Sequence, residues 1–169
     1  MTGSDETFNS IKALYMAAKG DFYIKSGRYK EAIEYYDKII KIYQFKLHPN
    51  PKLWSIWNHK GVAFVNLGKH KKALECFDKA LKLNPHEEAV WNNKGNALDK
   101  LGRYEEAIEC LDKALELNPK YEAAWLNKGI ALDNSGKHEE AIRCYDKALE
   151  INPKYRRYLE SHDRKTIRA

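Results

Sequence analysis

The sequence has few of the residues that would indicate a disulfide-rich, membrane-spanning or secreted protein. It contains only three cysteines in 169 residues, and a chain of this length forms a hydrophobic core without covalent cross-links. No apolar run approaches the roughly 18 residues of a membrane-spanning helix. Residues 1–6 carry acids where a secretory signal carries lysines. These features predict a soluble, cytoplasmic protein.

Motifs of common catalytic and cofactor sites are also missing. The chain contains no G-x-S-x-G, no C-x-x-C and no glycine-rich phosphate loop, and its six histidines include no H-x₃-H pair. The acidic pairs Glu105-Glu106 and Glu139-Glu140 begin predicted helices, where the helix dipole favours them without any catalytic role. We therefore expect no enzyme activity, no catalytic residue and no cofactor.

The formal charge of +6 raises the possibility of nucleic-acid binding. Residues 154–169 hold six basic and two acidic residues, a surplus of four charges, which leaves a surplus of two for the rest of the chain. A nearly balanced body does not favour a basic groove for nucleic acid. Any such activity would depend on this tail, so nucleic acid is a disfavoured partner.

An internal repeat of 34 residues organises most of the chain. Trp57, Trp91 and Trp125 lie 34 residues apart, which is the period expected of a tandem repeat. The same step relates Gly61, Gly95 and Gly129; Gly68, Gly102 and Gly136; Ala73, Ala107 and Ala141; Ala80, Ala114 and Ala148; and Asn84, Asn118 and Asn152, each before a proline.

An earlier copy of the repeat precedes these three at a step of 41 residues. Gly20 aligns with Gly61 and Ala32 with Ala73 at this step. The seven extra residues lie at about residues 44–50 and correspond to about two helical turns, so the helix can lengthen without rotating its apolar face. We expect a second helix here that extends beyond the stack.

Each repeat has the pattern of two helices joined by a turn. Trp91, Gly95 and Leu98 form one stripe at helical spacing, and Gly102 ends that helix. A second apolar stripe follows, and Asn118 ends it because the next residue is proline. The glycine and alanine columns are small enough for paired helices to approach closely. One such unit cannot bury enough apolar surface alone, so the units must stack.

Cysteine and histidine each recur at one repeat position without forming a recognisable site. Equivalent atoms of stacked helices should lie about 10 Å apart, too far for a disulfide or a shared zinc ion. We therefore interpret Cys76, Cys110 and Cys144 as semi-buried helix residues and expect no metal site. His70 and His138 share a column with tyrosines, which indicates a packing position.

These columns resemble the tetratricopeptide repeat family. Its signature, W-x₂-L-G-x₂-Y…A-x₃-F…P, corresponds here to Trp57, Gly61, Phe64, Ala73, Phe77 and Pro85, with lysine in place of the signature leucine and Met16 in place of the first tryptophan. The resemblance implies an all-α solenoid, a right-handed superhelix of four helix-turn-helix units and a C-terminal capping helix. The expected segments are an N-terminal extension at 1–12, units at 13–50, 51–86, 87–120 and 121–153, and a basic capping helix or tail at 154–169.

The resemblance also implies that the first helices line a concave groove that binds a peptide. In this family, asparagines two residues before the helix glycine hold the peptide backbone, and Asn93 and Asn127 occupy that column. The acids in neighbouring columns would favour a basic guest. The candidate peptide-binding residues are Asn58, His59, Val62, Asn92, Asn93, Asn96, Asp99, Leu126, Asn127, Ile130 and Asp133.

One familiar role of the family is not expected here. Members that grip the acidic C-termini of chaperones use lysine and arginine at set columns. Those columns hold Ala17, Ala89, Ala123 and Asn127 in this chain. We therefore predict no carboxylate clamp.

A second candidate docking patch consists of Tyr43, Phe45, Leu47 and Trp54. These residues either pack on one another or form an exposed surface for docking or self-association.

The sequence thus favours a non-enzymatic scaffold or adaptor that binds a peptide segment of a partner protein. The alternatives are a structural component that self-associates as a homo-oligomer and, less favoured, nucleic-acid binding through the basic tail. Neither the partner nor the process follows from the fold.

Overall fold

The computed structural model describes residues 3–44 and 52–155. This part of the chain is all-α, as the sequence predicts, and contains no strand. It forms two compact units, which divide between His86 and Glu87. Unit 1 contains α1 (Gly3–Lys25), α2 (Tyr29–Gln44), α3 (Leu53–Asn66) and α4 (His70–Leu83), and unit 2 contains α5 (Glu88–Asp99), α6 (Tyr104–Leu117), α7 (Glu122–Asn134), α8 (His138–Ile151) and the short 3₁₀ turn η1 (Pro153–Tyr155).

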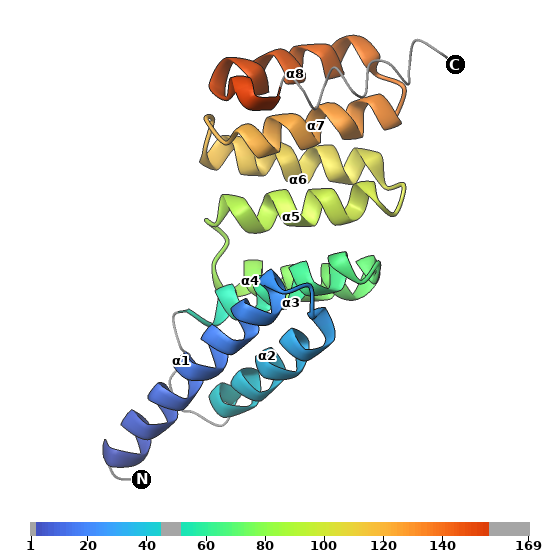
Figure 1. Ribbon diagram of the computed structural model, residues 1–169. Coiled ribbons are helices and arrows are strands. Elements are labelled where there is room, and N and C mark those ends of the chain that lie inside the picture. Colours follow the sequence, from blue (N-terminus) through green and yellow to red (C-terminus); the bar gives the residue numbers. More distant parts are fainter. Residues whose placement is uncertain (1–2, 45–51, 156–169) are drawn as a thin grey trace. The chain divides into compact units, whose positions relative to one another are not determined.

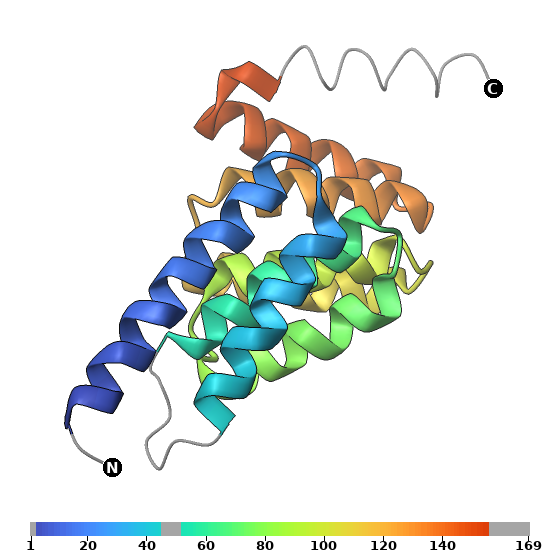
Figure 2. The ribbon, with the colours of Figure 1, turned by 60° about the horizontal axis from the view of Figure 1, so that its bottom comes forward.

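Both units are built from consecutive helix pairs. In unit 1, α1 pairs with α2 and α3 with α4, while α2 packs against α3 (Figures 1 and 2). Unit 2 repeats this order: α5 pairs with α6, α7 pairs with α8, and α6 packs against α7 (Figure 1). The first helices of neighbouring pairs also touch, α1 with α3 and α5 with α7. Each unit is therefore a short solenoid of two helix-turn-helix repeats.

The same glycine turn joins the two helices of each pair. Gly27, Gly68, Gly102 and Gly136 have φ between 69° and 84°, the left-handed region where glycine meets no Cβ penalty. In the pair α5/α6, the N–H of Arg103 donates to the carbonyl of Leu98 at 3.0 Å, which completes a Schellman motif. The equivalent bond recurs in the other three pairs. The predicted helix-stop glycine is confirmed.

Asparagine before proline has a role of its own at the end of the second helices. The Asn118 side-chain oxygen accepts a hydrogen bond from the backbone N–H of Lys120 at 3.1 Å, two residues further on. Asn84 and Asn152 form the same turn. The asparagine thus starts an Asx turn that leads the chain into the next segment.

Small residues allow the paired helices to approach closely, as predicted. Ala107 and Ala114 are fully buried, and a methyl group on Gly95 would lie 2.7 Å from Cγ of Leu111. The large side chains opposite the first-helix glycines are Tyr36, Phe77, Leu111 and Tyr145. The close approach of the two helices therefore depends on a missing side chain on the first helix and a bulky one on the second.

The helices differ in length between the units. The first helix, α1, has 23 residues, whereas α3, α5 and α7 have 12 to 14. The second helix α2 has 16 residues and the later second helices have 14. The rest of the predicted extension beyond Gln44, and the predicted capping helix from residue 156, lie outside the described residues. Within the described ranges, no helix combines the length and apolar character that crossing a membrane requires.

Candidate functional site

The polar side chains of α5 and α7 in unit 2 are ordered by hydrogen bonds between the two helices. The side-chain N–H of Asn127 donates to the side-chain oxygen of Asn92 at 2.8 Å. About two helical turns further along, Asn134 donates to the carboxylate of Asp99 at 2.7 Å. Asn92 and Asp99 are buried, at 5% and 8% exposure. Both bonds join residues 35 apart and fix α7 against α5.

Asp133 on α7 lies between two further donors. Its Oδ2 accepts a hydrogen bond from the Tyr145 hydroxyl at 2.7 Å, and its Oδ1 lies 3.0 Å from Nδ1 of His138. The His138 side chain is 64% exposed, so the prediction that this column is a packing position is wrong at His138. The histidine begins α8, where its ring reaches the end of α7 instead of entering the core.

In unit 1, an open cavity of about 270 Å³ lies between α1 and α3. Ile24 and Val62 supply apolar wall, and Asp21 supplies a carboxylate. The Asp21 Oδ1 accepts the hydroxyl of Tyr36 at 2.8 Å and lies 3.1 Å from Nδ1 of His59. The lining is Asp21, Ile24, Lys25, Tyr36, His59 and Val62.

The hydrogen bond between Tyr36 and Asp21 connects the lining of this cavity to the core of unit 1. Tyr36 is fully buried. Burial first, and then the hydrogen bond to Asp21, raises the pKa of Tyr36 well above its ordinary value. The hydroxyl is therefore a permanent donor that holds the carboxylate in place, and it has no role as a proton acceptor near neutral pH.

The candidate groove residues divide into supporting and accessible ones. Asn58, Asn92, Asp99 and Leu126 are buried, at 8% exposure or less, which leaves them few atoms for direct contact with a guest. The remaining candidates are half-buried: His59, Val62, Asn93, Asn96, Asn127, Ile130 and Asp133.

The second candidate patch is only partly described. Tyr43 is half-buried and packs against the core of unit 1, and Trp54 is half-buried on α3. Phe45 and Leu47 lie outside the described residues. The choice between burial and docking at this patch therefore stays a prediction.

The cysteines are reduced thiols within the helix pairs. Cys76, Cys110 and Cys144 are all buried. Burial raises the pKa of the Cys76 thiol to about 11 and also raises that of Cys144. In the part of the chain that the structure describes, no group of three or more histidine, cysteine, aspartate or glutamate side chains is placed to hold a metal ion.

Sequence reasoning missed the residues that organise these surfaces. Tyr36 and Tyr145 share one repeat column with Phe77 and Leu111, so the pattern predicts an apolar core position. Tyrosine occurs in the two repeats whose first helix carries an aspartate that the hydroxyl reaches, Asp21 or Asp133. That coincidence of tyrosine with aspartate is the signal that could have identified both pairs.

Comparisons of sequence identify the repeat directly. Residues 54–87, 89–121 and 122–155 match the family model of the tetratricopeptide repeat, and residues 13–45 match a second model of the same repeat. None of the curated proteins matches the chain.

Solved structures with a similar fold include two structures of MamA and one of YrrB. A crystal structure of MamA shares 23% sequence identity, covers 86% of this chain and 81% of its own, and has a TM-score of 0.72. MamA 41-end from Desulfovibrio magneticus RS-1 shares 26% identity over 92% of this chain and 88% of its own, with a TM-score of 0.72. YrrB, a TPR protein with an unusual peptide-binding site, shares 24% identity over 89% of this chain and 74% of its own, with a TM-score of 0.72.

Proposed function

We propose that this chain, which belongs to the tetratricopeptide repeat family, binds a peptide segment of a partner protein on its first helices. Members of the family are in general non-enzymatic interaction scaffolds. The similar fold of YrrB indicates that helix pairs of this kind can carry a peptide-binding site. In unit 2 the proposed contact residues are Asn93, Asn96, Asn127, Ile130 and Asp133, and in unit 1 they are Asp21, His59 and Val62.

The observation that carries this proposal is the orientation of the Asn127 amide. One of its N–H groups donates to Asn92, so the side chain is fixed before any guest arrives. The amide retains its second N–H and its carbonyl oxygen, a donor and an acceptor that match the N–H and C=O of a peptide backbone. A preformed amide lowers the entropy cost of binding, because the side chain is already ordered.

The charges of the accessible residues favour a basic or neutral guest. Asp21 and Asp133 each carry a carboxylate on a half-buried surface, where a lysine or arginine of the guest gains more than it would in bulk water. Val62 and Ile130 occupy the same repeat column as Asp21. Their apolar side chains would contact aliphatic parts of the guest. The columns that form a carboxylate clamp elsewhere hold Ala17, Ala89 and Ala123, so an acidic C-terminus finds no cation there.

The experiment is a selection of random peptides displayed on phage against the folded protein. We expect the selected peptides to be enriched in lysine, arginine and aliphatic residues. Their dissociation constants, measured by fluorescence anisotropy, should rise about tenfold for Asn127→Ala, which removes one donor and one acceptor. Glu116→Gln on α6 is the matched control, because this exposed side chain lies on a second helix, and it should leave binding unchanged.

Two outcomes would contradict the proposal. Selected peptides with free acidic C-termini would show that a carboxylate clamp exists after all. Peptides whose affinity responds to Glu116→Gln but not to Asn127→Ala would place the site on the second helices.

A further inference from the structure

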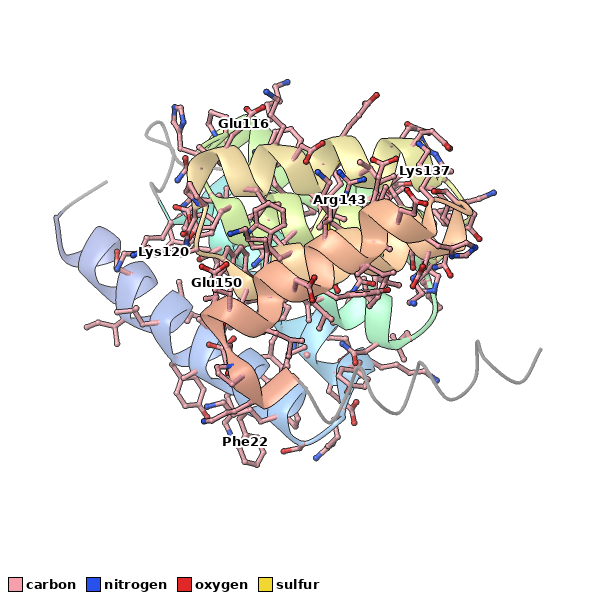
Figure 3. The ribbon with its side chains drawn as sticks, turned by 90° about the horizontal axis from the view of Figure 1, so that it is seen from above. Phe22, Glu116, Lys120, Lys137, Arg143 and Glu150 are labelled. Carbon is pink, nitrogen blue, oxygen red and sulfur yellow. The ribbon has the colours of Figure 1, made fainter. Side chains whose placement is uncertain are left out.

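The outer face of α1 carries an apolar stripe that is exposed. Tyr15 and Phe22 are 61% and 59% exposed, and Lys19 lies between them at helical spacing. The Phe22 ring extends away from the helix (Figure 3). The end of a repeat array normally presents a polar face to water, so a stripe with two exposed aromatic rings differs from an ordinary terminal face.

The equivalent residues of the other repeats indicate what kind of helix this stripe would contact. Tyr15, Lys19 and Phe22 correspond to Ala124, Lys128 and Ala131 of α7. Ala124 and Ala131 are fully buried, and α7 packs against α6, the second helix of the repeat before it. In α3 the same columns hold Ile56, Lys60 and Ala63, where α2 packs. No α-helix precedes α1 in the described part of the chain.

The partner stripe on the second helices also has a fixed composition. In α6 it is Ile108, Asp112 and Leu115, and in α2 it is Ile33, Asp37 and Ile40. Ile108 packs against the core of the next repeat, among Trp125 and Leu132. The apolar residues of one helix thus lie against the first helix of the following repeat.

An ion pair at the centre of each interface sets its register. Asp112 of α6 binds Lys128 of α7 at 2.5 Å, and Asp37 of α2 binds Lys60 of α3. The lysines are only 21% and 13% exposed, so each pair is partly shielded from water and from salt. A lysine on the first helix therefore meets an aspartate on the second helix before it.

The last second helix, α8, presents the same stripe, and in the described residues only the short 3₁₀ turn η1 follows it. Its members are Ile142, Asp146 and Leu149. Ile142 is 57% exposed, whereas Ile108 at the same column is half-buried, and Leu149 is half-buried where Leu115 is buried. Figure 3 looks onto α8, from which the labelled Arg143 and Glu150 extend.

We propose that two copies of this chain associate head to tail, with the stripe Ile142–Asp146–Leu149 of one copy seated on the stripe Tyr15–Lys19–Phe22 of the next. Asp146 then binds Lys19 as Asp112 binds Lys128. The two faces have matching apolar positions and opposite charges at the centre, so the α8 stripe is complementary to the α1 stripe. The contact is heterologous, and every copy keeps one α1 face and one α8 face for further copies.

The aromatic rings change the spacing of this contact but not its register. Tyr15 and Phe22 stand where α7 has alanines, so the docked helix must lie further from α1 than α6 lies from α7, toward the upper end of the 8–10 Å range of helix separations. A single helix-on-helix contact buries less than the roughly 1,200 Å² of a stable complex. Association should therefore be weak and should depend on protein concentration.

Sedimentation velocity over micromolar to submillimolar concentrations tests the proposal, which does not depend on the peptide-binding groove. We expect a mass that rises with concentration. Lys19→Glu should weaken association about tenfold, because it places two acids at the centre of the contact. The double variant Lys19→Glu/Asp146→Lys restores opposite charges and should return to within about threefold of the wild type.

Lys82→Glu is the matched control, since it makes the same charge change at an exposed site on α4 and should leave association unchanged. Phe22→Ser should also weaken association, with circular dichroism confirming that the helices remain folded. A chain that stays monomeric at every concentration would refute the proposal. This result is expected if another segment of the same chain covers α1, or if the predicted capping helix covers α8. Self-association that is unchanged in Lys19→Glu would equally refute this interface. So would a double variant in which association is not restored.

Discussion

Replacing Gly95 by alanine should destabilise unit 2, although alanine is the better helix former by about 1 kcal/mol. The added methyl group would lie 2.7 Å from Cγ of Leu111 and 3.1 Å from the backbone oxygen of Ala107. Carbon atoms in contact normally lie about 3.5–4.0 Å apart, so α5 and α6 must separate by about 1 Å. Overpacking of a core costs about 1–3 kcal/mol.

We expect the upper end of that range at Gly95. Leu111 is fully buried and its branched carbon cannot turn away, while the second contact is to backbone. Subtracting the gain in helix propensity leaves a net loss of about 2 kcal/mol. Urea denaturation followed by circular dichroism and tryptophan fluorescence measures this loss as a change in the free energy of unfolding.

A second background separates the steric cause from other effects. In Leu111→Ala the side chain that meets the methyl group is gone, so Gly95→Ala should there be neutral or stabilising by up to about 1 kcal/mol. If Gly95→Ala costs as much in the Leu111→Ala background as in the wild type, the steric reasoning is refuted.

Three further predictions concern other parts of the repeat. Gly102→Ala should lower the free energy of unfolding, measured by urea denaturation, by about 1 kcal/mol, because φ is 74° there and alanine is strained in that region. The loss is conformational, since no atom lies within 4 Å of the added methyl group. Tyr145→Phe should cost about 1 kcal/mol by the same assay, since it removes the hydrogen bond to Asp133. Burial raises the pKa of Cys76 to about 11, so the folded state retains the thiol proton to higher pH than the unfolded state does. The stabilisation that results is fully present below the ordinary thiol pKa and is lost as the pH rises through 11. Between about pH 8 and pH 10 the free energy of unfolding of the wild type should fall by about 1 kcal/mol more than that of Cys76→Ala.

The fold could be predicted from the sequence because its determinants repeat. A single tryptophan or glycine is weak evidence, but Gly61, Gly95 and Gly129 at one step identify a position where the chain requires a missing side chain. The structure gives the reason, since each glycine faces a bulky residue of the paired helix. The helix-ending glycines likewise combine a local conformational requirement with a fixed place in the repeat.

The surfaces were less predictable because they depend on pairs of residues from different repeats. The column comparison placed Asn92 and Asn127 on the same face but gave no sign that one donates to the other. It also grouped His138 with tyrosines as a packing residue, whereas the ring lies exposed beside Asp133. A repeat pattern records what each unit shares, and these contacts arise where the units differ.

The bond from Asn127 to Asn92 has a consequence for lengthening the protein. It joins residues 35 apart, one more than the repeat, so each unit supplies an acceptor at one position and a donor at the next. Residues 88–121 contain both, since Asn92 is followed by Asn93 in the donor column. A tandem duplication of this segment would therefore carry its own interlocking amides into every new junction, which makes it a self-sufficient module for engineering longer arrays.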